Sequence, residues 1–258
     1  MTEQAAPSPG FPAVQAGLPL FSAFGWLSRG LDDFKACPGP SLFYGICFAC
    51  MGAALNLAFA RYYHYVSALV SGFLLLGPFL VIGLYELSRR RERGQPCGLR
   101  PTLTAWRGNA GNLGVFSLIL IVVFLVWART SLVVFALFYT TEMPTLQGFL
   151  EQVVSMRNAE FLAVYLAVGA IFALLVFAAS VVSVPLMLDR NQDSVTAMLA
   201  SFLALARNVP ALLVWAATIV ALTAIGFATL YAGLAITVPL LGHATWHAYR
   251  DLVERDRK

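Results

Sequence analysis

Charge is the scarcest feature of this 258-residue chain. Asp, Glu, Lys and Arg make up only 12% of the residues, whereas soluble domains usually contain about 25%. Hydrophobic residues make up 59%, and the mean hydropathy is +0.76. A chain with so few charges cannot cover a soluble surface of this size. The composition therefore excludes an ordinary soluble domain and predicts a protein whose solvent is a lipid bilayer.

The short motifs of common enzymes are also missing. The chain has no Gly-rich phosphate loop, no G-x-S-x-G and no H-E-x-x-H. Its pI near 9.0 comes from cations spread along the flanks of apolar segments, so nucleic-acid binding is not predicted. We expect no enzymatic activity and no cofactor.

Cysteine is scarce as well, with four residues in all. Cys37 and Cys97 are predicted to lie on the reducing side of the membrane, so we expect no disulfide framework. Cys47 and Cys50 form a C-x-x-C inside an apolar segment. No charged group is nearby to stabilise a thiolate, so this motif favours packing over redox or metal chemistry.

Long apolar runs are what the chain has in abundance. A helix needs about 20 apolar residues to cross the hydrocarbon core. Six spans are the best count, with four or five left open, and the fifth and sixth are predicted to form a tight hairpin. The runs are Leu42–Ala60, Val66–Tyr85, Leu113–Trp127, Phe161–Leu188, Val209–Phe227 and Ala228–Leu241. A continuation of the third run to Tyr139 is left open, as is whether residues 129–139 span the membrane or lie on it.

One unit is repeated three times along these runs. When Cys37, Asn109 and Asn208 are aligned, apolar residues recur three, six and ten positions earlier. The returning spans carry Pro78, Pro185 and Pro239. We therefore predict an all-α membrane protein with six transmembrane helices as three related hairpin units. Each unit is preceded by a cytoplasmic interfacial amphipathic helix. Whether the units surround an axis or form a row is left open.

The domain boundaries follow from this pattern. Residues 1–19 are predicted to be a disordered tail. Residues 20–253 are predicted to be a single six-span membrane domain, and 254–258 a charged tail. The repeats cover about 20–88, 99–190 and 194–253.

The first amphipathic helix is predicted over residues 20–36. One stripe is apolar, and the charged residues are expected on the opposite, polar face: Arg29, Asp32, Asp33 and Lys35. In the third unit, Asp193 or Ser194 is a natural N-cap. Each copy ends beside a cation that suits the helix dipole and is expected to contact phosphate headgroups: Lys35, Arg107 and Arg207.

The cations also predict the orientation. Of 17 Lys and Arg residues, only Arg61, Arg129 and Arg157 fall on the external side when the N-terminus is placed inside. The positive-inside rule then puts both termini in the cytoplasm.

One polar cluster emerges from the repeat. If the units surround an axis, the ionisable residues near the ends of the returning spans converge at the cytoplasmic surface: Glu86, Asp189, Asp193, His243 and His247. His243 and His247 are four apart on one helix face, a spacing that can share a metal. With Asp189 or Glu86 they would form a two-His, one-carboxylate set. The alternative is interfacial pairing with neighbouring arginines.

Four stretches carry a family resemblance: GLYELSRRRERG (83–94), LTAWRGNAG (103–111), SVVSVPLMLDR (180–190) and LLGHATWHAYRDLV (240–253). From about Trp26 to Val253 the chain resembles a bacterial family of predicted integral membrane proteins without assigned function. Some members are labelled cytochrome c oxidase subunit I-like. A haem-copper catalytic subunit needs a fuller set of histidine ligands than the three in this chain: His64, His243 and His247.

The resemblance implies a multi-pass protein of the bacterial inner membrane that associates with an energy-transducing complex. We predict a non-enzymatic accessory subunit or assembly factor, whose partners are the lipid bilayer and a larger membrane complex. One alternative is a transporter or lipid-handling protein that uses a central crevice. A second is a metal- or haem-binding membrane protein that uses His243 and His247.

Overall fold

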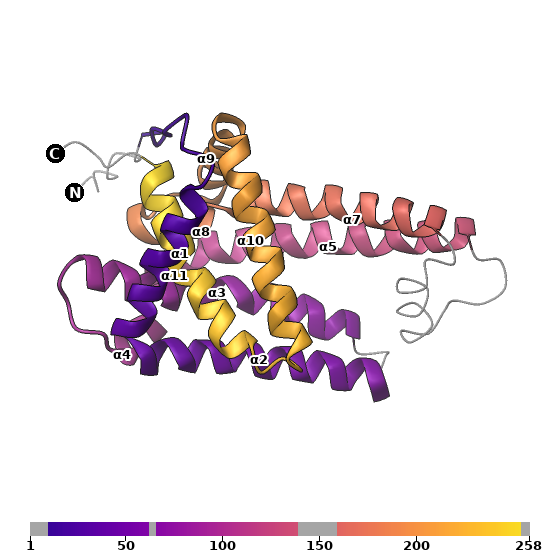
Figure 1. Cartoon of the computed structure of the whole chain (residues 1–258), viewed down its shortest axis with the longest axis horizontal. Helices are drawn as coiled ribbons and strands as arrows, with labels where there is room; N and C mark the ends of the chain where they lie inside the picture. The colour runs from indigo at the N-terminus through magenta and orange to yellow at the C-terminus, as the bar shows by residue number, and fades with distance from the viewer. Residues whose placement is uncertain (1–9, 62–65, 139–158, 254–258) are drawn as a thin grey trace, which may run out of the picture.

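The computed structural model describes residues 10–61, 66–138 and 159–253. Across these ranges the regular structure is helical, with one isolated antiparallel bridge between Val14 and Val253. In chain order the elements are α1 (Ser22–Ala36), α2 (Pro38–Arg61), α3 (Val66–Glu92), α4 (Leu99–Leu103), the 3₁₀ helix η2 (Ala105–Asn109), α5 (Ala110–Phe138), α7 (Ala159–Ser180), α8 (Ser183–Arg190), α9 (Ser194–Arg207), α10 (Val209–Ala228) and α11 (Leu234–Leu252) (Figure 1).

Five stretches of the described chain are long and apolar enough to cross a membrane: Pro38–Ala58, Gly72–Glu92, Leu99–Phe138, Ala159–Arg190 and Val209–Ala228. The predicted all-α membrane class is confirmed at this level. The sixth predicted span, Ala228–Leu241, is not among them. It comprises the turn after α10 and the first part of α11, a helix that ends in polar residues. The sixth span and the three hairpin units remain predictions.

Helix α11 lies against α1, α2 and α3, and small residues allow the close approach. A Cβ on Gly30 of α1 would lie 2.7 Å from the backbone nitrogen of Ala244. A Cβ on Gly45 of α2 would collide with the carbonyl oxygen of Ala235. In a bilayer, where lipid is as apolar as the side chains, such small residues let helices pack closely. Gly45 therefore serves packing within the chain.

The core of this region is aromatic. Trp26 of α1 and Trp215 of α10 are both fully buried, and their rings meet edge to face with centroids 5.7 Å apart. The indole nitrogen of Trp26 donates to Asp251 Oδ2 at 2.8 Å, and Arg29 pairs with the same carboxylate at 2.5 Å. Packing and polar pairing together hold α1 along the end of α11.

Residues 10–19 belong to this folded region, although the sequence analysis assigns them to a disordered tail. Arg207 donates to the carbonyl of Val14 at 2.8 Å, and the Asn208 amide donates to the carbonyl of Gln15 at 2.8 Å. The Leu18 amide in turn donates to Asn208 Oδ1 at 3.0 Å. These long-range bonds satisfy backbone groups that a proline-rich segment cannot pair internally. The prediction stands untested for residues 1–9, which lie outside the described residues.

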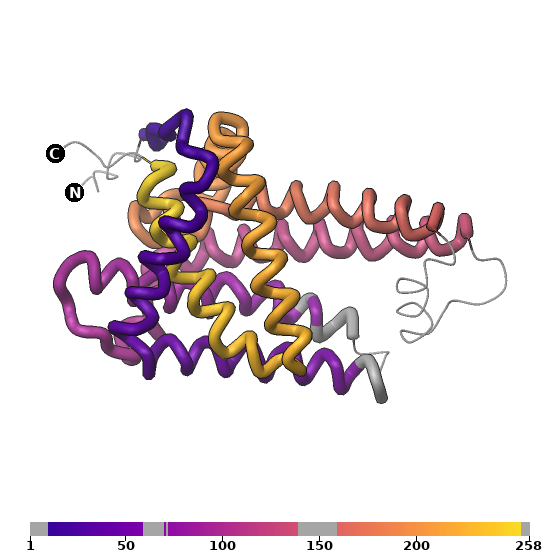
Figure 2. The backbone as a smooth tube through the Cα atoms, in the orientation of Figure 1, coloured from indigo at the N-terminus to yellow at the C-terminus, as the bar shows by residue number. Residues whose placement is uncertain are grey.

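A second region consists of α5 and α7, which run side by side and extend away from the other helices (Figures 1 and 2). Their far ends are joined by aromatic contacts, with the Phe135 and Phe161 ring centroids 5.0 Å apart. Only 11% of the most apolar window of each stretch is buried, compared with 44% for the stretch that contains α3. Among the described residues, the α5–α7 hairpin therefore has few neighbours along its length.

Candidate functional site

A buried carboxylate marks the strongest polar site, where α1, α3 and α11 meet. Asp33 lies on the face of α1 that also buries Ala23, Trp26 and Gly30. Its side chain is only 3% exposed. The sequence pattern predicts Asp33 on the polar face with Asp32, and that prediction is wrong for Asp33. Asp32 is exposed, whereas Asp33 follows Trp26 by seven residues and so points in the same direction.

Two cationic or protonatable groups face Asp33. Arg91 of α3 forms an ion pair with Oδ1, and His247 Nε2 of α11 lies 2.9 Å from Oδ2. Burial alone would raise the pKa of the Asp33 carboxyl, but hydrogen bonds from His247, Ser88 and Arg91 outweigh it and lower the pKa below its usual 3.8. The carboxyl is therefore held as the anion, and it ties three helices together.

His243 lies one turn before His247 and is fully buried. Its Nε2 lies 2.9 Å from Ser41 Oγ of α2, and its Nδ1 lies 2.8 Å from Ser88 Oγ of α3. Ser41 Oγ also donates to the carbonyl of Cys37 at 2.7 Å. Both ring nitrogens of His243 thus have protein partners, and the ring joins α11 to α2 and α3. We call Asp33, Ser41, Ser88, Arg91, His243 and His247 the Asp33 network.

A second polar group lies further along α11. Asp189 of α8 accepts from Tyr249 Oη at 2.9 Å and from Arg250 at 3.2 Å, and Arg93 lies 3.5 Å away. Arg250 also pairs with Glu92 of α3 at 3.0 Å. This group links α8 and α3 to the end of α11. The predicted pairing of Asp189 with a neighbouring arginine is confirmed.

The other predicted acids lie elsewhere. Glu86 pairs with Arg89 at 2.5 Å and lies 3.9 Å from Arg90, both on its own helix. Asp193 is the N-cap of α9 and accepts from the backbone nitrogen of Thr196 at 2.9 Å. That backbone hydrogen bond lowers the pKa of the Asp193 carboxyl. The capping role was one of the two alternatives predicted from the sequence.

The sequence-predicted residues therefore do not share one site. His243 and His247 belong to the Asp33 network, while Asp189, Glu86 and Asp193 have separate partners. In the ranges that the structure describes, no three His, Cys, Asp or Glu side chains are grouped so that they could hold a metal. The spacing of Asp33 from Trp26 and Gly30 could have indicated that it lies on the buried face of α1. The neighbouring charged residues of α1 instead suggested a polar face.

The three predicted headgroup cations lie at the ends of their helices. Lys35, Arg107 and Arg207 are all exposed. The Arg107 guanidinium lies over the Trp106 ring, 5.7 Å from its centroid. Arg207 also uses one nitrogen to hold the carbonyl of Val14.

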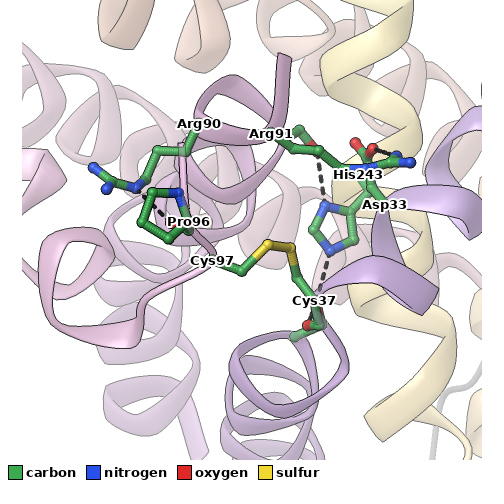
Figure 3. Close-up of a disulfide and its surroundings, with 9 residues drawn as sticks. Asp33, Cys37, Arg90, Arg91, Pro96, Cys97 and His243 are labelled. Atoms are coloured by element: carbon green, nitrogen blue, oxygen red, sulfur yellow. Dashed lines mark hydrogen bonds and ion pairs between the residues drawn. A yellow bond between two sulfur atoms is a disulfide. The ribbon is translucent and has the colours of Figure 1, made fainter. Parts of the chain in front are cut away.

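A disulfide lies beside the Asp33 network. Cys37, between α1 and α2, is bonded to Cys97, which precedes α4, and the two Cα atoms are 5.6 Å apart (Figure 3). The sequence predicts no such pairing, because the cation pattern assigns both residues to the reducing side. Sixty residues separate the two cysteines, so only the fold brings them together. Cys47 and Cys50 are free.

Comparison with known proteins agrees with the membrane class of the chain. Residues 66–189, from α3 to α8, match the model of a family described as predicted integral membrane protein (DUF2189). The predicted resemblance to an integral membrane family without assigned function is thereby confirmed over residues 66–189. No curated protein and no solved structure matches the chain. The protein is an integral, multi-pass membrane protein of unknown function.

Proposed function

We propose that this protein is a non-enzymatic accessory subunit or assembly factor of a larger bacterial inner-membrane complex of energy-transducing type. The observation that carries the proposal is the α5–α7 hairpin, whose two stretches are each only 11% buried over their most apolar windows. A hairpin with so few neighbours in the part of the chain that the structure describes has most of its membrane surface available to another helical protein.

The surface of the hairpin suits close helix contacts. Cβ atoms added at Gly111, Gly114 or Gly169 would meet nothing within 4 Å. In a bilayer, helices associate through close packing at small residues, because lipid provides no hydrophobic drive between them. The flanking exposed side chains are large and apolar, and those more than half exposed are Leu118, Val122, Val126, Val133, Leu137, Leu166 and Ile171. These features support a partner made of membrane helices.

The polar residues support a structural role. Asp33 faces His247 and Arg91, and His243 has serine partners on both ring nitrogens. These groups hold helices to one another, and the chemistry of the donor set does not favour the metal- or haem-binding alternative. No feature of the site specifically favours the transport alternative.

We also propose six spans with both termini in the cytoplasm. Gly45 and Gly52 of α2 contact α11 and the turn before it, which supports α11 as a span that returns beside α2. At 1.5 Å per residue, Arg129 lies about 28 Å along α5 from Ala110, close to the thickness of the hydrocarbon core. This distance supports the assignment of Arg129 to the opposite interface.

Three equivalent positions support interfacial helices. Six residues before each aligned turn, Leu31, Leu103 and Phe202 are 40%, 44% and 37% exposed. Exposed cations follow at Lys35, Arg107 and Arg207. An apolar side chain beside a cation suits the boundary between acyl chains and headgroups.

The test is purification from the native membrane into nanodiscs, followed by mass spectrometry. We expect a second membrane protein in fixed ratio with the wild type. Gly114→Leu should abolish its recovery without destabilising the chain, because a Cβ at this position would meet no atom within 4 Å. Val220→Ala, on the exposed face of α10, is the control and should retain the partner. Recovery of the wild type alone, or with lipid only, would overturn the proposal.

A further inference from the structure

We propose that Cys37 and Cys97 form a reversible thiol–disulfide exchange site that takes dithiol reductants. The inference rests on the proposed orientation but not on the accessory role. The two cysteines belong to segments that close onto each other at the cation-rich end of the helices (Figure 3). Their Cα separation of 5.6 Å lies at the usual value for disulfides, so the bond can form and reform without backbone movement.

The side of the membrane on which the disulfide lies determines whether it is permanent or is reduced and re-formed. Cys97 follows the arginine run of α3 by a few residues, and Arg100 follows it closely. The positive-inside rule assigns this end to the cytoplasm. Thiol reductants there keep most cysteines reduced, and the disulfides that do form are usually transient, catalytic or redox-sensing. A permanent structural disulfide would be expected on the external side of the membrane.

The two sulfurs are not equivalent. Cys97 is partly exposed, whereas Cys37 is 2% exposed. Cys37 directly precedes the 24-residue helix α2, and its carbonyl accepts from the Ser41 amide at 3.1 Å. Cys37 is also the C-cap of α1, so the negative end of α1 and the positive end of α2 both act on its sulfur. Access favours attack at Cys97 Sγ, which leaves Cys37 as the departing thiolate.

The exchange balances in two steps. One thiolate of the dithiol attacks Cys97 Sγ, the bond between the two cysteine sulfurs breaks, and Cys37 leaves as a thiolate. The second thiolate of the reductant then attacks its own sulfur in the mixed disulfide and releases the Cys97 thiolate. The dithiol is oxidised to a disulfide and loses two electrons, and the two cysteines gain them and take protons from water.

The bond lies next to the Asp33 network. The carbonyl of Cys37 accepts from Ser41 Oγ, which contacts His243 Nε2. On the other side, Arg90 Nε donates to the carbonyl of Pro96 at 3.2 Å and shapes the segment that carries Cys97 (Figure 3). Reduction would release this segment from the start of α2, with the Tyr44–Thr102 hydrogen bond of 2.8 Å as a remaining link to α4.

The first experiment measures the redox state in living cells. In a Cys47→Ser/Cys50→Ser background, cells are acid-quenched and free thiols are tagged with a maleimide–polyethylene glycol. We expect two tags in untreated cells, none after the thiol oxidant diamide, and two again after its removal. A pair that stays bonded in untreated cells, or that never loses its tags after diamide, would overturn the proposal.

Two further measurements keep the test independent of folding defects. A membrane-impermeant maleimide should label the pair in inside-out vesicles and not in intact cells, and the reverse result would overturn the cytoplasmic assignment.

In purified protein, Cys37→Ser should accumulate a mixed disulfide with oxidised glutathione, and Cys97→Ser should not. Equal amounts of the glutathione mixed disulfide in the two variants, with both unfolding at the wild-type temperature, would contradict attack at Cys97.

Discussion

The region around α11 and the α5–α7 hairpin differ in how their helices are held in place. Around α11, buried polar side chains and close glycine contacts join helices from distant parts of the chain. Along the hairpin, two apolar helices pair with each other, and most of their surface has no neighbour among the described residues. The first region is specified by internal contacts, whereas the second depends on what surrounds it.

The difference shows where single substitutions will act. In the α11 region each change removes a contact that the chain itself makes, so the free energy of unfolding should respond. On the hairpin the same change leaves the isolated chain intact, and only association in the membrane should respond.

Loss of the buried carboxylate should have a large effect. Asp33→Ala removes the partner of His247 and Arg91, and breaking a buried pair typically costs about 3–5 kcal/mol. Because the Arg91 side chain is 40% exposed and can be rehydrated, we expect about 2–4 kcal/mol here. The measurement is thermal unfolding in detergent. Asp32→Ala, at the exposed neighbour, is the control and should change stability by less than about 0.5 kcal/mol.

Glycine substitutions should have different effects on stability in the two regions. Gly45→Ala forces a Cβ against the backbone of Ala235 and should destabilise the protein by about 1–3 kcal/mol. Gly114→Ala adds the same methyl group where α5 has open space, and it should be neutral or stabilising by up to about 1 kcal/mol. Equal unfolding temperatures for the two variants would mean that α2 and α11 do not pack as closely as described.

Acid should weaken the Asp33 network. The pKa of Asp33 is lowered in the folded protein, so its contribution to stability is fully present above the usual value of 3.8 and is lost as the pH falls through the folded pKa. The stability difference between the wild type and Asp33→Asn should therefore be constant near neutral pH and shrink below pH 3.8. A difference that does not depend on pH down to complete unfolding would show that the carboxylate charge does not stabilise the fold.

The smallest effect is expected at the far end of the hairpin. Leu137 is 73% exposed, and Leu137→Ala should change stability by less than about 0.5 kcal/mol in detergent. Leu84→Ala removes the same atoms from a fully buried position on α3 and should cost about 2–5 kcal/mol. Chemical denaturation of the two variants side by side measures the contrast.

Membrane class and helix type were predictable because they follow from local hydropathy. The five apolar stretches overlap the predicted runs, and the N-cap at Asp193 follows from residue type alone. The continuous helix from Ala110 to Phe138 shows that the run beginning at Leu113 extends beyond Trp127. Local sequence is enough for these features because each one depends on neighbouring residues.

The site was less predictable because its contacts join distant segments. His243 and His247 were singled out by spacing, but the partner of His247 is Asp33, more than 200 residues away. Because one face of α1 is apolar, the sequence predicts that the opposite face is exposed to solvent. That opposite face also carries Trp26 and Gly30, and it packs on α11. The cysteine pair needed the same long-range information.

Crosslinking in the native membrane tests most directly whether the hairpin is a partner surface. A photoreactive amino acid is placed at Ile171 of α7, which is 66% exposed, and at Val220 of α10, which is 67% exposed. The account predicts a discrete protein adduct of one mass from Ile171 and lipid adducts alone from Val220. Lipid adducts alone from both positions would contradict the proposed accessory role.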